Sequence, residues 1–196
     1  WIEKAQMQLL PANGDLTAAE INLLEAENAP GRLRTALASV EWNFDIIMID
    51  CPPALNMLTV NALTAAQSVI VPVQCEYYAL EGLSALLDTI DKVRNSTNPK
   101  LRIEGVLRTM FDPRNRLAND VSAQLLAHFG DTVFETLVPR NVRLAEAPSY
   151  GLPIIYYDDG SRGAQSYRDL AKEVRKRLRR PPPKTAATTQ GTGQSA

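Results

Sequence analysis

The chain has 196 residues, of which 45% are hydrophobic and 22% charged, a balance typical of a soluble globular domain with a sizeable core. The net charge of −1 excludes a globally basic surface, so any DNA contact has to come from a local basic patch. The longest apolar stretches are shorter than the roughly 20 residues that span a bilayer. The first residues, WIEKAQMQ, do not have the pattern of a signal peptide, so we expect a cytoplasmic protein without a membrane partner.

Two short helices are predicted near the start of the chain. Thr17 precedes Glu20 by three residues, which is the capping-box spacing and predicts a helix over about 17–28. A Pro-Gly pair ends it, and RLRTALASV over 32–40 is typical of a second short helix.

The run FDIIMI over 44–49 is almost continuously apolar and stops at Asp50. A short run without polar alternation predicts a strand buried on both faces of a parallel sheet. A carboxylate at the end of such a strand can hold Mg²⁺, usually through water, as the Walker B aspartate of nucleotide-hydrolysing proteins does. An aspartate there can also cap a helix or a turn, and both interpretations stay open on the pattern alone.

Strand and helix patterns alternate along the rest of the chain. Strands are predicted over 68–73, 103–111 and 132–139, and helices around 59–66, 79–96, 119–129 and 163–178. The alternation predicts an α/β fold with a doubly wound, mostly parallel sheet whose ligands bind at the carboxyl ends of the strands. We expect one domain over 1–180 and a disordered tail over 181–196, where no apolar residue is larger than alanine.

Three long stretches resemble the ParA/Soj family of chromosome- and plasmid-partitioning ATPases. They are DIIMIDCPPALNMLTVNALTAAQSVIVPVQCEYYALEGLSALLDTI, IEGVLRTMFDPRNRL and VPRNVRLAEAPSYGLPIIYYDDGSRGAQSYRDLAKEV. The resemblance implies a P-loop NTPase fold of the deviant-Walker type that binds ATP and Mg²⁺ and forms a homodimer on ATP binding. It also implies nonspecific binding to double-stranded DNA, nucleoid association and a ParB-like partner that stimulates hydrolysis.

The resemblance assigns a role to the end of the apolar run. Asp50 corresponds to the Walker B carboxylate, with a catalytic role and a water-mediated role at magnesium. Cys51, Pro52 and Pro53 correspond to the start of the switch that senses the γ-phosphate. From the residues alone, the prolines could equally form a simple turn, and Cys51 is better interpreted as a small buried thiol than as a redox group.

Four further residues match family positions beside the adenine base: Thr109, Met110, Pro139 and Asn141. The amide of Asn141 offers both a donor and an acceptor, which suits an adenine edge. Without the resemblance, Asn141 is more typical of a turn.

The resemblance also implies two DNA contacts, Arg114 in DPRNRL and Arg143 in NVRLAEA. Arginine can bind phosphate oxygens in a bidentate manner without reading sequence, although both residues could also be ordinary solvated charges. The basic run over 172–180 is either a solvated helix end or an additional DNA contact.

No Gly-Lys dipeptide occurs in the sequence, whereas a phosphate loop needs glycines followed by lysine. The family carries this loop at its N-terminus, so we expect a truncated chain that lacks the Walker A unit and does not hydrolyse ATP by itself. Two alternatives remain: a nucleotide-free module that binds DNA or a partner, and a MinD-like division ATPase. The latter predicts a bulky amphipathic C-terminal helix, which KEVRKRLRRPPP does not provide.

Overall fold

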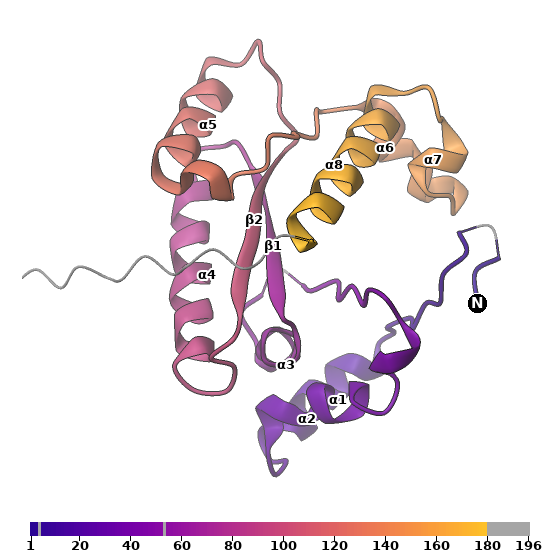
Figure 1. Ribbon diagram of the computed structural model, residues 1–196, viewed down its shortest axis with the longest axis vertical. Helices are drawn as coiled ribbons and strands as arrows, with labels where there is room; N and C mark the ends of the chain where they lie inside the picture. The colour runs from indigo at the N-terminus through magenta and orange to yellow at the C-terminus, as the bar shows by residue number, and fades with distance from the viewer. Residues whose placement is uncertain (4, 53, 180–196) are drawn as a thin grey trace, which may run out of the picture.

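The computed structural model describes residues 1–3, 5–52 and 54–179 (Figure 1). Its α-helices are α1 (Asp15–Leu24), α2 (Arg32–Leu37), α3 (Met57–Ala65), α4 (Ala79–Arg94), α5 (Arg116–Phe129), α6 (Val142–Glu146), α7 (Ile154–Tyr157) and α8 (Arg162–Leu178). Short 3-10 helices are η1 (Ala29–Gly31), η2 (Glu41–Asn43), η3 (Gly130–Thr132) and η4 (Ala147–Tyr150). The strands are β1 (Ser68–Gln74) and β2 (Arg102–Thr109). The predicted tail over 181–196 lies outside the described residues.

β1 and β2 are parallel neighbours, as the apolar patterns predict. The segment 133–139 runs beside β2 in the same direction, through bridges from Val106 to Val133 and from Phe111 to Pro139. The strand predicted over 132–139 is not formed: residue 132 belongs to η3, and the segment 133–139 joins β2 only through isolated parallel bridges. All three segments end at one edge of the sheet.

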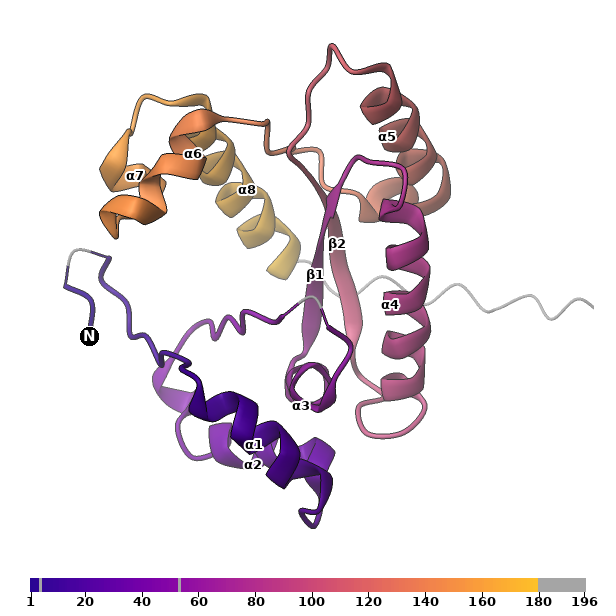
Figure 2. The same ribbon diagram turned by 180° about the vertical axis from the view of Figure 1, so that it is seen from behind.

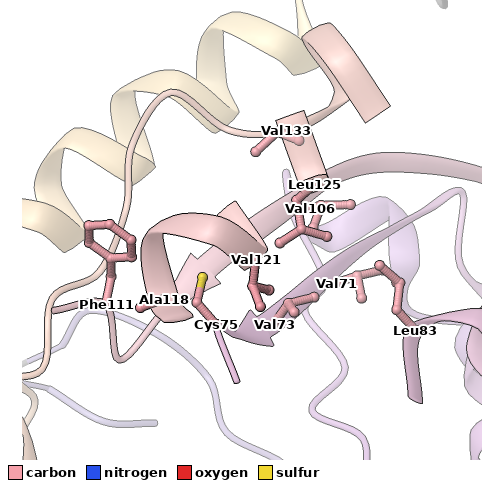
Figure 3. Packing of buried hydrophobic residues seen from close by; sticks show 10 residues of the cluster. All are labelled: Val71, Val73, Cys75, Leu83, Val106, Phe111, Ala118, Val121, Leu125 and Val133. Carbon is pink, nitrogen blue, oxygen red and sulfur yellow. The ribbon is translucent and has the colours of Figure 1, made fainter. Parts of the chain in front are cut away.

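Helices cover both faces of this sheet (Figures 1 and 2). On the face of α4 and α5, the core includes Leu83 and Leu125, which pack with Val71 and Val106 (Figure 3). On the opposite face, Leu170 and Val174 of α8 belong to a second cluster, which is centred on three buried residues: Leu107, Phe134 and Val138. This arrangement confirms the predicted doubly wound α/β fold.

Gly105 of β2 shows how closely the second cluster is packed. A Cβ atom at this position would overlap the ring of Phe134, which is fully buried. A side chain at Gly105 would therefore have to displace the central aromatic group of that face.

The prediction for residues 44–49 is wrong in this structure. These residues form neither helix nor strand, and the side chains of Ile46 and Met48 are 56% and 84% exposed. A strand exists only through hydrogen bonds to a neighbour, and β1 pairs with β2 rather than with this segment. Apolar composition predicted burial, but it could not supply the neighbouring strands that burial requires.

Helix boundaries differ from prediction where asparagines and glycines cap the ends. α1 begins at Asp15, two residues ahead of Thr17, and its N-cap is Gly14 rather than the predicted capping-box threonine. α5 begins at Arg116 rather than at residue 119, because the side-chain oxygen of Asn115 accepts hydrogen bonds from the first turn. Among the described residues, no helix is both long enough and apolar enough to cross a membrane.

Candidate functional site

The candidate site lies where β2 and the segment 133–139 end. The backbone N–H of Phe111 donates to the carbonyl oxygen of Val138 at 3.1 Å, and the N–H of Arg140 donates to that of Phe111 at 3.1 Å. These two hydrogen bonds hold the residues that follow β2 beside Pro139. It therefore brings together the two sequence stretches that were predicted to contact the base.

Thr109 and Met110 form the first half of this edge. Thr109 is the last residue of β2 and stands in register with Gln74 at the end of β1. Met110 has a φ of 52°, which is uncommon for a residue with a side chain, and its side chain is 47% exposed. The backbone turns sharply there and presents the Met110 side chain to solvent.

Asn141 forms the second half and is also the N-cap of α6. Its side-chain oxygen accepts a hydrogen bond from the N–H of Leu144 at 3.2 Å. The capping interpretation and the ligand interpretation are compatible, because the cap uses the oxygen and leaves the Nδ2 donor for another partner.

Asp50 lies ahead of α3, outside any helix or strand, and is exposed. Partial desolvation and the neighbouring Asp50 carboxylate raise the pKa of the Cys51 thiol. Cys51 is exposed, so the buried-thiol interpretation is wrong here, although its raised pKa does not favour a reactive thiolate. Pro52 is exposed as well, and Pro53 lies outside the described residues.

Within the described residues, no group of three or more histidine, cysteine or acidic side chains is placed to hold a metal ion. A single exposed carboxylate such as Asp50 remains compatible with Mg²⁺, since this ion keeps several waters and takes only one or two protein carboxylates.

Arg114 forms a bidentate pair with a nearby carboxylate. Its Nε and Nη2 atoms donate to the two carboxylate oxygens of Asp112 at 3.0 and 2.9 Å. Hydrogen bonds from Arg114 lower the pKa of Asp112 to about 2. The Arg114 side chain is 88% exposed, but a phosphate would have to compete with Asp112 for the Nε and Nη2 donors.

Arg143 on α6 lies in a cluster of acidic and aromatic groups. Its Nη1 donates to Glu146 at 2.8 Å, and its Nε lies 3.2 Å from a carboxylate oxygen of Asp158. The hydrogen bond to Glu146 raises the pKa of Arg143, and the same bond lowers the pKa of Glu146. Sequence reasoning identified the arginine but did not find its acidic partners.

Glu173 and Arg177 of α8 bind backbone groups of β2 and of the chain over 132–136. Glu173 accepts hydrogen bonds from the N–H groups of Glu135 and Thr136 at 3.0 and 2.9 Å. Arg177 donates to the carbonyl oxygens of Glu104, Thr132 and Val133 and to Glu173 itself. The i,i+4 spacing of Glu173 and Arg177 was the available signal for this pair.

Four other cations of the run form a separate surface. A shallow cavity of about 330 Å³ is lined by Lys172, Arg175, Lys176 and Arg179. Their spacing places them along α8, and each is exposed. Within the described part of the run, Arg177 is thus structural, whereas Lys172, Arg175, Lys176 and Arg179 form an exposed basic face.

Arg108 of β2 is a further residue that the sequence pattern did not reveal. It is only 8% exposed and donates to the hydroxyl of Ser122 and to the carbonyl oxygens of Phe134 and Glu135. Its Nε has no hydrogen-bond partner among the described residues. A buried guanidinium bound by neutral acceptors ties β2 to α5 and to the segment that leads to Pro139.

Comparison with known proteins agrees with this architecture. Residues 2–103, just over half of the chain, match the AAA domain family. A solved structure of cobyrinic acid a,c-diamide synthase from Mycobacterium smegmatis, with bound ADP and magnesium, matches with a TM-score of 0.73 and 37% identity. The match covers 88% of this chain and 63% of the synthase chain.

MinD from Pyrococcus furiosus, a cell division ATPase, matches with a TM-score of 0.60 over 78% of this chain and 60% of its own. At 23% identity, that match shows the fold alone. The fold and these matches define the chain as an α/β protein of the P-loop NTPase class.

The sequence relatives are more specific. The sporulation initiation inhibitor protein Soj of Bacillus subtilis is 54% identical over 168 residues, which are 86% of this chain and 66% of Soj. The chromosome partitioning protein ParA of Myxococcus xanthus is 52% identical over 175 residues, 89% of this chain and 62% of that protein. An uncharacterized protein of Pseudomonas putida is 59% identical over 187 residues, 95% of this chain and 71% of its own length. The chain belongs to the ParA/Soj family of chromosome-partitioning ATPases, and it spans about two thirds of the length of these relatives.

Proposed function

We propose that the protein carrying this chain is an ATP-dependent partitioning protein. In this proposal it binds ATP with Mg²⁺, forms a homodimer, associates with nucleoid DNA without sequence preference and hydrolyses ATP with a ParB-like partner. Family membership supports the partitioning role. The finer steps are proposals about the whole protein, since this chain spans only part of its relatives.

The observation that carries the proposal is the convergence of Thr109, Met110, Pro139 and Asn141 at one edge of the sheet. Parallel α/β sheets bind ligands at the carboxyl ends of their strands, which is where these residues lie. In our proposal, the Nδ2 of Asn141 donates to an acceptor nitrogen of adenine while its oxygen continues to cap α6. Met110 provides an exposed apolar surface beside the base.

Magnesium would supply charge neutralisation at the phosphates when it is bound. In our proposal Asp50 holds this ion through water, and Cys51 to Pro53 form the switch that follows.

For DNA, we propose contacts from Arg114 and Arg143, with the basic face of α8 adding nonspecific affinity. Charge supports this assignment. The basic face offers four exposed cations along one helix, which suits a phosphate backbone rather than particular bases.

The adenine assignment can be tested with a fluorescent ATP analogue, titrated with Mg²⁺ into the protein from the complete reading frame. Asn141→Ser keeps a capping oxygen for Leu144 but is too short to reach the base. We expect affinity to fall about tenfold, which corresponds to roughly one hydrogen bond. Thr89→Ala, which removes an exposed hydroxyl from α4, is the control. Unchanged affinity in Asn141→Ser would exclude the proposed base contact.

The magnesium assignment can be tested in the same protein with Asp50→Ala. We expect ATP turnover to be lost while the circular dichroism spectrum is retained, because Asp50 is exposed and its side chain is not part of the core. Normal hydrolysis would exclude the Walker B role of Asp50.

A further inference from the structure

The guanidinium of Arg143 is exposed in part but is already paired with two carboxylates. Glu146 occupies Nη1 at 2.8 Å, and Asp158 lies 3.2 Å from Nε, so two carboxylates already occupy two of the three guanidinium nitrogens. The side chains of Arg143, Glu146 and Asp158 are 53%, 37% and 36% exposed. All three groups are thus accessible to solvent and to a large anionic ligand.

The first of these carboxylates is held in place by an aromatic residue. The hydroxyl of Tyr157 donates to the same oxygen of Glu146 at 3.0 Å, and the ring of Tyr157 packs against that of Tyr150 at 4.8 Å between centroids. Glu146 is therefore fixed from two sides, which reduces the entropy lost when it pairs with Arg143.

The two carboxylates come from different elements. Glu146 is the last residue of α6, only three positions from Arg143, whereas Asp158 directly follows α7. The connection between α6 and α7 contains η4 and Gly151, which has a φ of 62°. A change in the position of α7 relative to α6 would therefore remove Asp158 and Tyr157 from the cluster together.

We propose that Glu146 and Asp158 form an acidic shield that competes with DNA phosphates for Arg143, so that tight DNA binding requires the shield to open. This inference rests on the proposed DNA contact of Arg143. A phosphate that approaches the guanidinium meets two negative charges within hydrogen-bond or ion-pair distance of it. Carboxylates and phosphates bind the same donors of arginine, so one set must leave before the other can bind fully.

The chain offers a matched control for this proposal. Asp159 is adjacent to Asp158 and 69% exposed, but it pairs with Arg168 and not with Arg143. Asp159→Asn and Asp158→Asn change the net charge equally and at neighbouring positions. Any general effect of losing one negative charge should therefore appear in both variants. The two variants differ in the arginine that they release, Arg143 in Asp158→Asn and Arg168 in Asp159→Asn.

The experiment measures binding of the protein from the complete reading frame, with ATP and Mg²⁺, to a duplex of random sequence over a series of salt concentrations. We expect Glu146→Gln and Asp158→Asn each to raise affinity roughly threefold over Asp159→Asn at low salt, in the range of an exposed ion pair. The slope of log affinity against log salt should steepen by about one as Arg143 gains a full phosphate contact. Tyr157→Phe, which changes no charge, should give a smaller rise in the same direction.

Two outcomes separate the shield from the DNA contact itself. If Arg143→Ala leaves DNA affinity unchanged, the proposed DNA contact of Arg143 is wrong. If Arg143→Ala weakens binding but Glu146→Gln and Asp158→Asn bind no better than Asp159→Asn, the DNA contact stands and the shield is wrong. The proposal further requires that both gains disappear when the variants are combined with Arg143→Ala.

Discussion

Glu173→Ala should weaken the attachment of the segment 133–139, which ends at the candidate site. The Glu173 carboxylate is the acceptor for the N–H groups of Glu135 and Thr136, in the stretch where the ladder between β2 and the segment 133–139 is interrupted. A side chain of α8 therefore completes the hydrogen bonding of this segment in place of a neighbouring strand. Without it, Glu135 and Thr136 lose the hydrogen bonds that join them to α8, while the contacts of Arg177, Leu170 and Val174 remain.

The magnitude follows from these contacts. The Thr136 N–H is partly buried, so its bond to a charged acceptor contributes about 1.5 kcal/mol, whereas the exposed bond from Glu135 contributes about 0.5 kcal/mol. Arg177 keeps its three carbonyl acceptors but loses its ion pair with Glu173, so the two backbone hydrogen bonds give the lower limit of the change. We expect unfolding to be easier by at least about 2 kcal/mol, which lowers Tm by at least about 4 °C for a domain of this size.

Burial by itself raises the pKa of Glu173, but hydrogen bonds from Thr136, Glu135 and Arg177 outweigh burial and lower the pKa. A carboxyl whose pKa is lower in the folded state stabilises the fold above its unfolded value of about 4.3. That contribution is lost as the pH falls through the folded value. The difference between the parent and Glu173→Ala should therefore be full at pH 7 and should shrink in acid.

Urea unfolding followed by far-ultraviolet circular dichroism measures the change, and hydrogen exchange at residues 134–140 locates it. Asp169→Ala is the control, because Asp169 lies on the same helix but pairs only with exposed side chains of α8. If Glu173→Ala unfolds at the same urea concentration as Asp169→Ala, and residues 134–140 stay equally protected, the role given to Glu173 is wrong.

Three further predictions concern packing and charge. Gly105→Ala should destabilise the fold by about 1–3 kcal/mol in urea unfolding, because the new methyl group overlaps Phe134; an unchanged midpoint would contradict the close packing. Asp112 should titrate near pH 2 by NMR and return to its ordinary range in Arg114→Gln, since hydrogen bonds from Arg114 lower its pKa; an unchanged titration would exclude that cause. Lys176→Gln should reduce the salt dependence of DNA binding by about one unit of log–log slope without changing sequence preference, and an unchanged slope would remove α8 from the DNA surface.

Much of the fold could be predicted because its local patterns agree with its packing. The strands predicted over 68–73 and 103–111 are β1 and β2, and the helix predicted over 163–178 is α8, with ends shifted by no more than two residues. Apolar spacing predicts which residues face a core, and here the core that they need is present on both faces of the sheet.

The family resemblance named the residues of the candidate site, but it did not give their contacts. Thr109, Met110, Pro139 and Asn141 were identified from motifs, and the parallel arrangement of their segments accounts for their meeting at one edge. The second function of Asn141, as the cap of α6, also follows from local chemistry.

By itself, the sequence determined the α/β class, the family and the residue types at the strand ends, because these depend on local periodicity and on long specific motifs. Only the tertiary structure decided which charged side chains are paired and which are exposed. It placed Glu146 and Asp158 on Arg143, turned Arg177 inward and left residues 45–49 exposed. The physical reason is that an ion pair or a strand ladder requires two partners at a short distance, and that distance is set by packing between elements rather than by local sequence.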